Sequence, residues 1–215
     1  MDYLDNGYKV VRIVVTGGPC GGKTTAIDRI KEVFQKEGYQ ILIIPETATQ
    51  LITNGISPRI CKSMASYQYW QMRMQLEKEK IYSGAAEEIA GVWGKDILII
   101  CDRGMLDNKA YVTDEEFEEL LQELGYTEGD CLSWYDGVFH MMTAAKGAEK
   151  FYTLSNNAAR GETLEEAAAL DDRGIYVWEN HPVHVILDNS TGFEEKLQRL
   201  TDGIRNVLKD LDSEQ

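Results

Sequence analysis

Basic residues are scarce in this chain. Its 215 residues include 22 Lys and Arg against 36 Asp and Glu, which gives a formal net charge of −14 at pH 7. Binding to a nucleic-acid backbone needs clustered cations that release counterions, so this balance argues against a nucleic-acid partner. Small anionic ligands are still compatible with it, because a nest of backbone N–H groups and a few cations can hold them.

Cysteine and histidine are also rare. The four cysteines are far apart and form no CxxC or Cys/His cluster, a pattern typical of reduced thiols in an intracellular protein: Cys20, Cys61, Cys101 and Cys131. Of the three histidines, His181 and His184 flank a proline and have no third ligand nearby, so we expect structural roles for them.

Long apolar runs are missing as well. No stretch reaches 18 consecutive apolar residues, and the acidic N-terminus lacks the basic region and apolar segment of a signal peptide. We therefore expect no transmembrane segment and a soluble, cytoplasmic protein. The length suits one α/β domain over residues 1–215, and no internal repeat or low-complexity linker divides it.

A complete GxxxxGK(S/T) phosphate-binding loop follows the apolar run Val10–Val15. Its glycines let backbone N–H groups surround phosphate oxygens, Lys23 adds a charge on the β- and γ-phosphates, and the Thr24 hydroxyl can ligate Mg²⁺. The apolar pattern after it predicts a helix. The sequence thus predicts a nucleoside triphosphate at these residues: Gly17, Gly18, Pro19, Cys20, Gly21, Gly22, Lys23, Thr24 and Thr25.

Strand-like and helical segments alternate along the chain, which predicts a parallel sheet with helices on both faces. The five expected strands are Val10 to Thr16, Tyr39 to Ile44, Asp96 to Cys101, Tyr135 to Met142, and Val183 to Leu187. Ligands of such sheets gather at the carboxyl ends of the strands.

Helix signals fit this scheme. Capping-box patterns begin at Thr113 and Thr163, and an apolar stripe from Phe193 to Leu211 predicts a final helix. A further long helix is expected between Pro58 and Ala90, where Met and aromatic residues cover more than one face. This helix either packs on the sheet or also lines a pocket for a second substrate.

Polar residues follow two of the predicted strands. Asp102 closes the third run as a Walker B carboxylate would, and is the candidate to hold Mg²⁺ through water, although it could instead cap the next turn. Arg103 could bridge the transferred phosphoryl group and the acceptor, or form an ion pair with Asp107. Glu46 follows the second strand, as a base or clamp for an acceptor hydroxyl or as a helix cap.

Two later segments complete the candidate site. The polar stretch from Asn156 to Glu162 is interpreted as a mobile lid, and either Arg160 or Arg173 could neutralise charge on the triphosphate, although solvent exposure is the commoner state of a loop Arg. Asn189 follows the last strand, where backbone groups could contact the nucleotide base or cap the last helix.

Taken in order, these motifs resemble those of the small P-loop AAA-type ATPase/kinase-like family. That family is related to the nicotinamide-riboside kinase domain of NadR proteins and, more distantly, to deoxynucleoside and thymidylate kinases. The resemblance runs from Arg12 to about Leu208 and rests on Gly17 to Thr25, Pro45 to Ala48, Asp102 to Gly104, Asn157 to Arg160, and His181 to Asn189 with Phe193 and Lys196.

The resemblance implies a three-layer P-loop NTPase fold, with a five-stranded parallel sheet in the order 2-3-1-4-5, helices on both faces and a lid segment. It implies ATP or GTP bound with Mg²⁺, and acceptor contacts by Glu46, Asp102 and Arg103. The lid departs from the family pattern, because Arg160 is present without the paired RxxxR spacing of many deoxynucleoside kinases. That difference argues against deoxynucleoside kinase activity.

Two functions are therefore predicted. The favoured one is a small-molecule kinase that transfers the γ-phosphoryl group of ATP or GTP to a nucleoside- or riboside-like hydroxyl. The alternative is a nucleotide-dependent switch or binding module with slow hydrolysis, acting through a protein or lipid partner. A Ras-like GTPase is disfavoured, because the chain has no NKxD motif. The acceptor, the choice between ATP and GTP, and the oligomeric state are left open.

Overall fold

The computed structural model describes residues 7–151 and 163–213. Its centre is a parallel sheet of five strands in the order β2-β3-β1-β4-β5. The strands are β1 (Val10–Thr16), β2 (Gln40–Ile44), β3 (Ile97–Asp102), β4 (Gly137–Met141) and β5 (His184–Leu187). The sequence-based prediction of a P-loop NTPase α/β fold with this strand order is confirmed.

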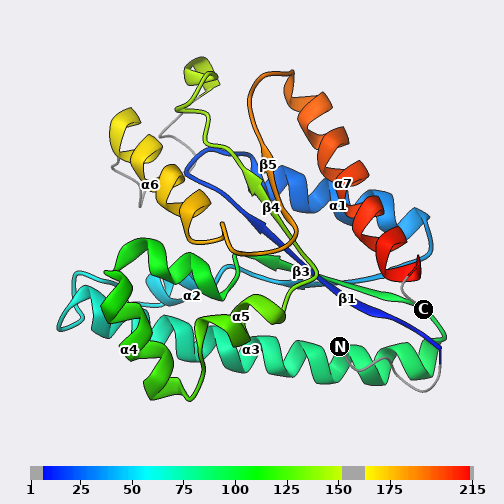
Figure 1. The fold of residues 1–215 in the computed structure, drawn as a ribbon, viewed down its shortest axis with the longest axis horizontal. Helices are drawn as coiled ribbons and strands as arrows, with labels where there is room; N and C mark the ends of the chain where they lie inside the picture. The colour runs from blue at the N-terminus through cyan, green and yellow to red at the C-terminus, as the bar shows by residue number, and fades with distance from the viewer. Residues whose placement is uncertain (1–6, 152–162, 214–215) are drawn as a thin grey trace.

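Helices surround the sheet (Figure 1). In chain order they are α1 (Lys23–Lys36), α2 (Thr47–Thr53), α3 (Met64–Trp93), the 3-10 helix η1 (Met105–Tyr111), α4 (Asp114–Leu124), α5 (Glu128–Ser133), the 3-10 helix η2 (Glu149–Phe151), α6 (Leu164–Tyr176) and α7 (Phe193–Ser213). In the described part of the chain, none of these helices combines the length and apolar character that crossing a membrane requires.

Each face of the sheet has its own buried cluster. On one face, β1 side chains such as Ile13 pack with Ile30 of α1 and Leu200 of α7. On the other, Val14 packs with Met72 of α3 and Phe117 of α4. Alternate residues of β1 therefore point into opposite layers, because successive strand side chains face opposite sides, and strands covered on both sides are apolar throughout.

Local signals set several helix ends. The capping boxes at Thr113 and Thr163 form as predicted, with each Thr hydroxyl accepting from the backbone N–H three residues on. Gly125 ends α4 in the left-handed conformation. The helix expected from the 58–90 pattern begins at Met64, after the cap residue Ser63, and ends at Trp93, with Gly94 as its C-cap at φ +62°.

Candidate functional site

The phosphate-binding loop lies where β1 ends and α1 begins. Gly17 has φ +134°, and a Cβ on it would stand 2.1 Å from the Met141 carbonyl oxygen of β4. Gly22, at φ +86°, is the N-cap of α1, and no side chain of the described residues caps that helix. Glycine at position 17 is thus required for the close approach of the loop to β4. The backbone N–H groups at the start of α1 are suited to binding an anion.

Lys23 opens α1 beside the loop. It is buried, and its Nζ donates to the carbonyl oxygens of Gly17, at 2.9 Å, and Gly18, at 3.2 Å. Thr24 and Thr25 follow it, exposed, in the first turn of α1. The Lys23 ammonium therefore contacts the backbone of the same loop that is expected to bind a triphosphate.

A buried carboxylate from α6 holds the loop. Asp171 Oδ1 accepts from the backbone N–H groups of Gly18, at 2.9 Å, and Thr143, at 3.0 Å, and lies 2.9 Å from His140 Nε2. Its Oδ2 accepts from Lys146 Nζ at 3.0 Å. Burial alone would raise the pKa of Asp171, but the hydrogen bonds and charges of His140 and Lys146 lower it to about 2. Asp171 is therefore ionised, and it fixes the backbone beneath the loop.

Sequence reasoning missed Asp171. One signal was available: Asp is a poor residue for a helix interior, and Asp171 follows an Ala-rich stretch in the middle of α6. Such a residue needs a partner, but the partners lie on three other segments and cannot be read from the sequence.

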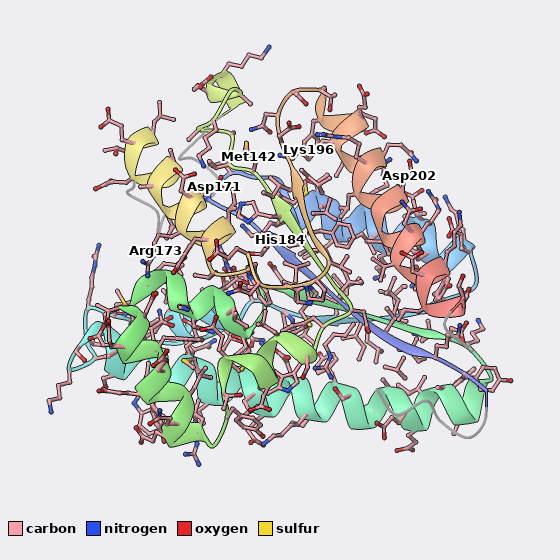
Figure 2. The ribbon with its side chains drawn as sticks, in the orientation of Figure 1. Met142, Asp171, Arg173, His184, Lys196 and Asp202 are labelled. Carbon is pink, nitrogen blue, oxygen red and sulfur yellow. The ribbon has the colours of Figure 1, made fainter. Side chains whose placement is uncertain are left out.

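Asn189, which follows β5, supports the same region. Its Nδ2 donates to the carbonyl oxygens of Thr143 and Lys146, at 2.8 and 2.7 Å, and its Oδ1 accepts from Lys196 Nζ at 2.8 Å. Figure 2 shows Lys196 of α7 reaching toward Met142, whose carbonyl oxygen it contacts at 2.9 Å. Because the Asn189 amide is used within the chain, the predicted contact with a nucleotide base is left to backbone groups.

Glu46 and Arg103 form an ion pair between the ends of β2 and β3. Arg103 Nε donates to Glu46 Oε1 at 2.6 Å, and its Nη1 lies 3.5 Å from Asp107 Oδ1. Of the two roles considered for Arg103 from the sequence, the ion pair with Asp107 is present, and the ion pair with Glu46 was not predicted. Arg103 also has φ +70°, an uncommon conformation for a non-glycine residue that is typical of functional sites.

The ion pair between Glu46 and Arg103 shifts the pKa of each residue so that both stay charged. Burial would raise the pKa of Glu46, but the charge of Arg103 and a hydrogen bond from Thr49 bring it down to about 2. Burial disfavours the guanidinium, yet Tyr111, Glu46 and Asp107 hold the pKa of Arg103 above its usual value. Glu46 precedes α2, but its side chain makes no capping bond to that helix.

Asp102 is the last residue of β3. Burial, and then the neighbouring charge of Glu46, raise the pKa of Asp102. Its Oδ1 is buried and has no hydrogen-bond partner among the residues the structure describes. A buried, unpartnered carboxylate oxygen suits a hard cation. In the described ranges, no three or more His, Cys, Asp or Glu side chains form a group that could hold a metal ion.

The two candidate lid arginines have different outcomes. Arg160 lies outside the described residues. Arg173 Nη2 donates to the carbonyl oxygens of Lys109 and Val112, at 3.0 and 2.8 Å, and lies 3.8 Å from Asp114. The Arg173 guanidinium thus joins α6 to the end of η1 instead of pointing at the loop.

A cavity of about 270 Å³ opens beside the loop. Pro19 of the loop, Glu46 and Arg103 are part of its wall, and α3 contributes Met64 and Tyr67. Its other lining residues are Thr47, Ala48, Thr49, Ile52, Thr53, Pro58, Gln68, Gln71, Gln75, Gly104, Asp107, Asn108, Tyr111 and Leu170. Of the two roles considered for the α3 helix, packing on the sheet and lining a pocket, it has both.

Most of the chain matches a known protein family. A family model described as an AAA domain matches residues 12–196, a range that includes the loop, Glu46, Arg103 and Asp171. The match supports nucleotide binding by a P-loop domain. A search of curated proteins gives no match.

Proposed function

The chain belongs to the AAA-domain family, and on that premise we propose that it is a Mg²⁺-dependent small-molecule kinase. The donor is ATP or GTP at the phosphate-binding loop, and the acceptor is a nucleoside- or riboside-like hydroxyl in the adjoining cavity. One observation carries the proposal: the Glu46–Arg103 ion pair lies in the wall of a cavity that also touches Pro19 of the loop. Donor and acceptor sites would then be contiguous, as phosphoryl transfer requires.

On the donor side, the N–H groups of the loop and of the start of α1 would bind phosphate oxygens, and Lys23 would exchange its carbonyl contacts for the β- and γ-phosphates. Thr24 and Asp102 offer the hydroxyl and carboxylate oxygens that Mg²⁺ prefers, and the unpartnered Asp102 Oδ1 supports this role. The metal would neutralise charge on the phosphates.

On the acceptor side, Glu46 would act chiefly by orientation. A carboxylate with a pKa of about 2 is a weak proton acceptor at neutral pH, since an efficient general base has a pKa near the working pH. As a hydrogen-bond acceptor it can still hold the attacking hydroxyl in line with the γ-phosphate. Arg103 would hold Glu46 in place and stabilise charge on the transferred group.

The test is nucleotide turnover measured with and without a panel of nucleosides and ribosides. We expect at least one acceptor to accelerate ADP or GDP release and to yield a phosphorylated product by mass spectrometry. The Lys23→Ala protein provides the background rate. Release that no acceptor changes, with no phosphorylated product, would refute the kinase and favour the nucleotide-dependent switch.

A further inference from the structure

Three polar side chains of α3 lie buried in the cavity wall with an oxygen that has no partner in the described part of the chain. They are Tyr67, 2% exposed, Gln68, 2% exposed, and Gln71, 6% exposed. The unpartnered atoms are the Tyr67 hydroxyl and the side-chain carbonyl oxygens of the two glutamines. A buried polar atom without a partner is unfavourable, so three of them beside one cavity suit a polar ligand.

The amide of Gln71 is fixed so that its oxygen is the free atom. Asn108 Nδ2 donates to the Met105 carbonyl oxygen at 2.8 Å and to Gln75 Oε1 at 3.1 Å. Asn108 Oδ1 therefore faces Gln71 and accepts from its Nε2 at 2.6 Å. Because a backbone carbonyl can only accept, this chain of bonds leaves Gln71 Oε1 as an acceptor without a donor.

Gln68 presents the same chemistry. Its Nε2 lies 3.9 Å from the Met64 sulfur, a weak contact that still occupies the amino side of the amide. The cavity wall therefore contains two amide oxygens one helical turn apart, at positions 68 and 71, and both are without a donor among the described residues. The pKa of Tyr67 is raised to about 12, mainly by burial and then by Glu46, so its hydroxyl stays protonated.

The charged side chains in the cavity wall also restrict the charge that a ligand can carry. Glu46 and Asp107 are carboxylates, and Arg103 is the one cation among the described lining residues, where it contacts both. A carboxylate or phosphate on the far end of an acceptor would meet carbonyl oxygens and no free cation. A neutral head with N–H donors satisfies the wall.

We propose that Gln68 and Gln71 select acceptors whose ring carries an amino or amide N–H group. This rests on the proposed function, in that the cavity is taken as the acceptor site. The hydroxyl to be phosphorylated would lie at Glu46 and Arg103, and the N–H group of the ring would donate to the two glutamine oxygens.

The experiment compares nucleosides that differ by one amino group, using calorimetry with the protein saturated by a non-hydrolysable ATP analogue. One pair is adenosine and purine riboside, and the other is cytidine and the same pyrimidine riboside without its 4-amino group. We expect the amino nucleoside of at least one pair to bind about tenfold more tightly or better, which corresponds to about 1.4 kcal/mol. This comparison needs no substitution, so it does not depend on how a variant folds.

Variants then assign the preference to the glutamines. Gln71→Met keeps the length of the side chain but removes the acceptor, and should reduce the preference to about threefold or less. Gln68→Met should act in the same direction. Gln122→Met makes the same change at an exposed position of α4, and should leave the preference intact.

Equal affinity within both pairs, binding of none of the four nucleosides, or a full preference in both glutamine variants would overturn the assignment. Its failure is separable from that of the kinase. Selective binding without phosphorylated product would keep the selection and refute transfer, and transfer without selectivity would do the reverse.

Discussion

The backbone N–H of Gly18 donates to Asp171 Oδ1 across 2.9 Å, although the two residues are 153 positions apart. The bond joins the phosphate-binding loop to α6, and the same carboxylate also accepts from Thr143 of the segment after β4. The loop is therefore held from outside its own motif, and its geometry depends on an ionised side chain.

Replacing Asp171 with Ala should weaken both stability and nucleotide binding. Two buried N–H groups would lose their acceptor, so we expect about 2–4 kcal/mol of destabilisation in urea unfolding and at least about tenfold weaker triphosphate binding by calorimetry. Asp172→Ala is the matched control, since that neighbour is exposed and contacts only Lys146 among the ion pairs of the described residues. Equal losses in both variants would contradict the anchoring role.

Lys23→Ala should weaken triphosphate binding by at least about tenfold, because it removes the charge beside the β- and γ-phosphates. Calorimetry with ATP and GTP measures the loss and shows which nucleotide is preferred. Lys36→Ala, at the exposed end of the same helix, should bind normally. Unchanged affinity in Lys23→Ala would refute the assignment of the loop.

Glu46→Gln should spare nucleotide binding and reduce transfer by about 10²-fold, since the amide loses the charge that holds the acceptor hydroxyl and Arg103 in position. Single-turnover assays with a saturating acceptor measure this rate. Glu77→Gln, at an exposed position on α3, serves as the control. Full transfer by the Glu46 variant would remove Glu46 from the mechanism.

Acid should destabilise the fold through Glu46 and Asp171. Both carboxylates have a pKa of about 2 in the folded chain, below their unfolded values near 4. Their stabilisation is therefore complete above about pH 4 and is lost as the pH falls toward 2. For one group, a depression of about two units corresponds to about 2–3 kcal/mol.

The measurement is the free energy of unfolding in urea at pH 7, 4 and 3, for the native sequence and for Asp171→Asn. Burial raises the pKa of Asp136 to about 6, and this group acts in the opposite direction. The informative quantity is therefore the difference between the two proteins, which should shrink as the pH falls. A difference that does not change with pH would contradict the shift of Asp171.

Gly17→Ala should be strongly destabilising, by about 2 kcal/mol or more. The new methyl would overlap the Met141 carbonyl oxygen, a backbone atom that cannot move aside, and φ +134° disfavours any side chain. Gly192→Ala is the control, because a Cβ there meets nothing within 4 Å in the described structure. Thermal unfolding of the two variants should separate them by several degrees.

Much of the fold could be predicted because the strands are nearly continuous apolar runs. The predicted bounds of β3 differ from the observed ones by one residue at each end, Ile97 and Asp102. The short α5 escaped prediction because its signal, the capping box at Thr127, is followed by one turn and a half of helix. Elements marked by a long run of neighbouring residues could be predicted from the sequence, and an element as short as α5 could not.

The arrangement of the candidate site could be predicted where it depends on neighbouring residues or adjacent strands. Lys23 and the loop glycines lie in one motif, and Glu46 and Arg103 follow strands whose adjacency brings them together. The left-handed backbone of Arg103, the Asp171 anchor and the Gln71 amide depend on contacts between distant segments. No pattern within a single segment contains that information.

The Gly18–Asp171 bond also affects when the phosphate-binding loop reaches its folded geometry during protein synthesis. The phosphate-binding motif leaves the ribosome before α6, because the acceptor for its Gly18 N–H comes 153 residues later. A nascent chain that ends before α6 has the motif without the carboxylate that sets its backbone. The loop would reach its final geometry only after α6 has been synthesised, as expected of contacts with a large sequence separation.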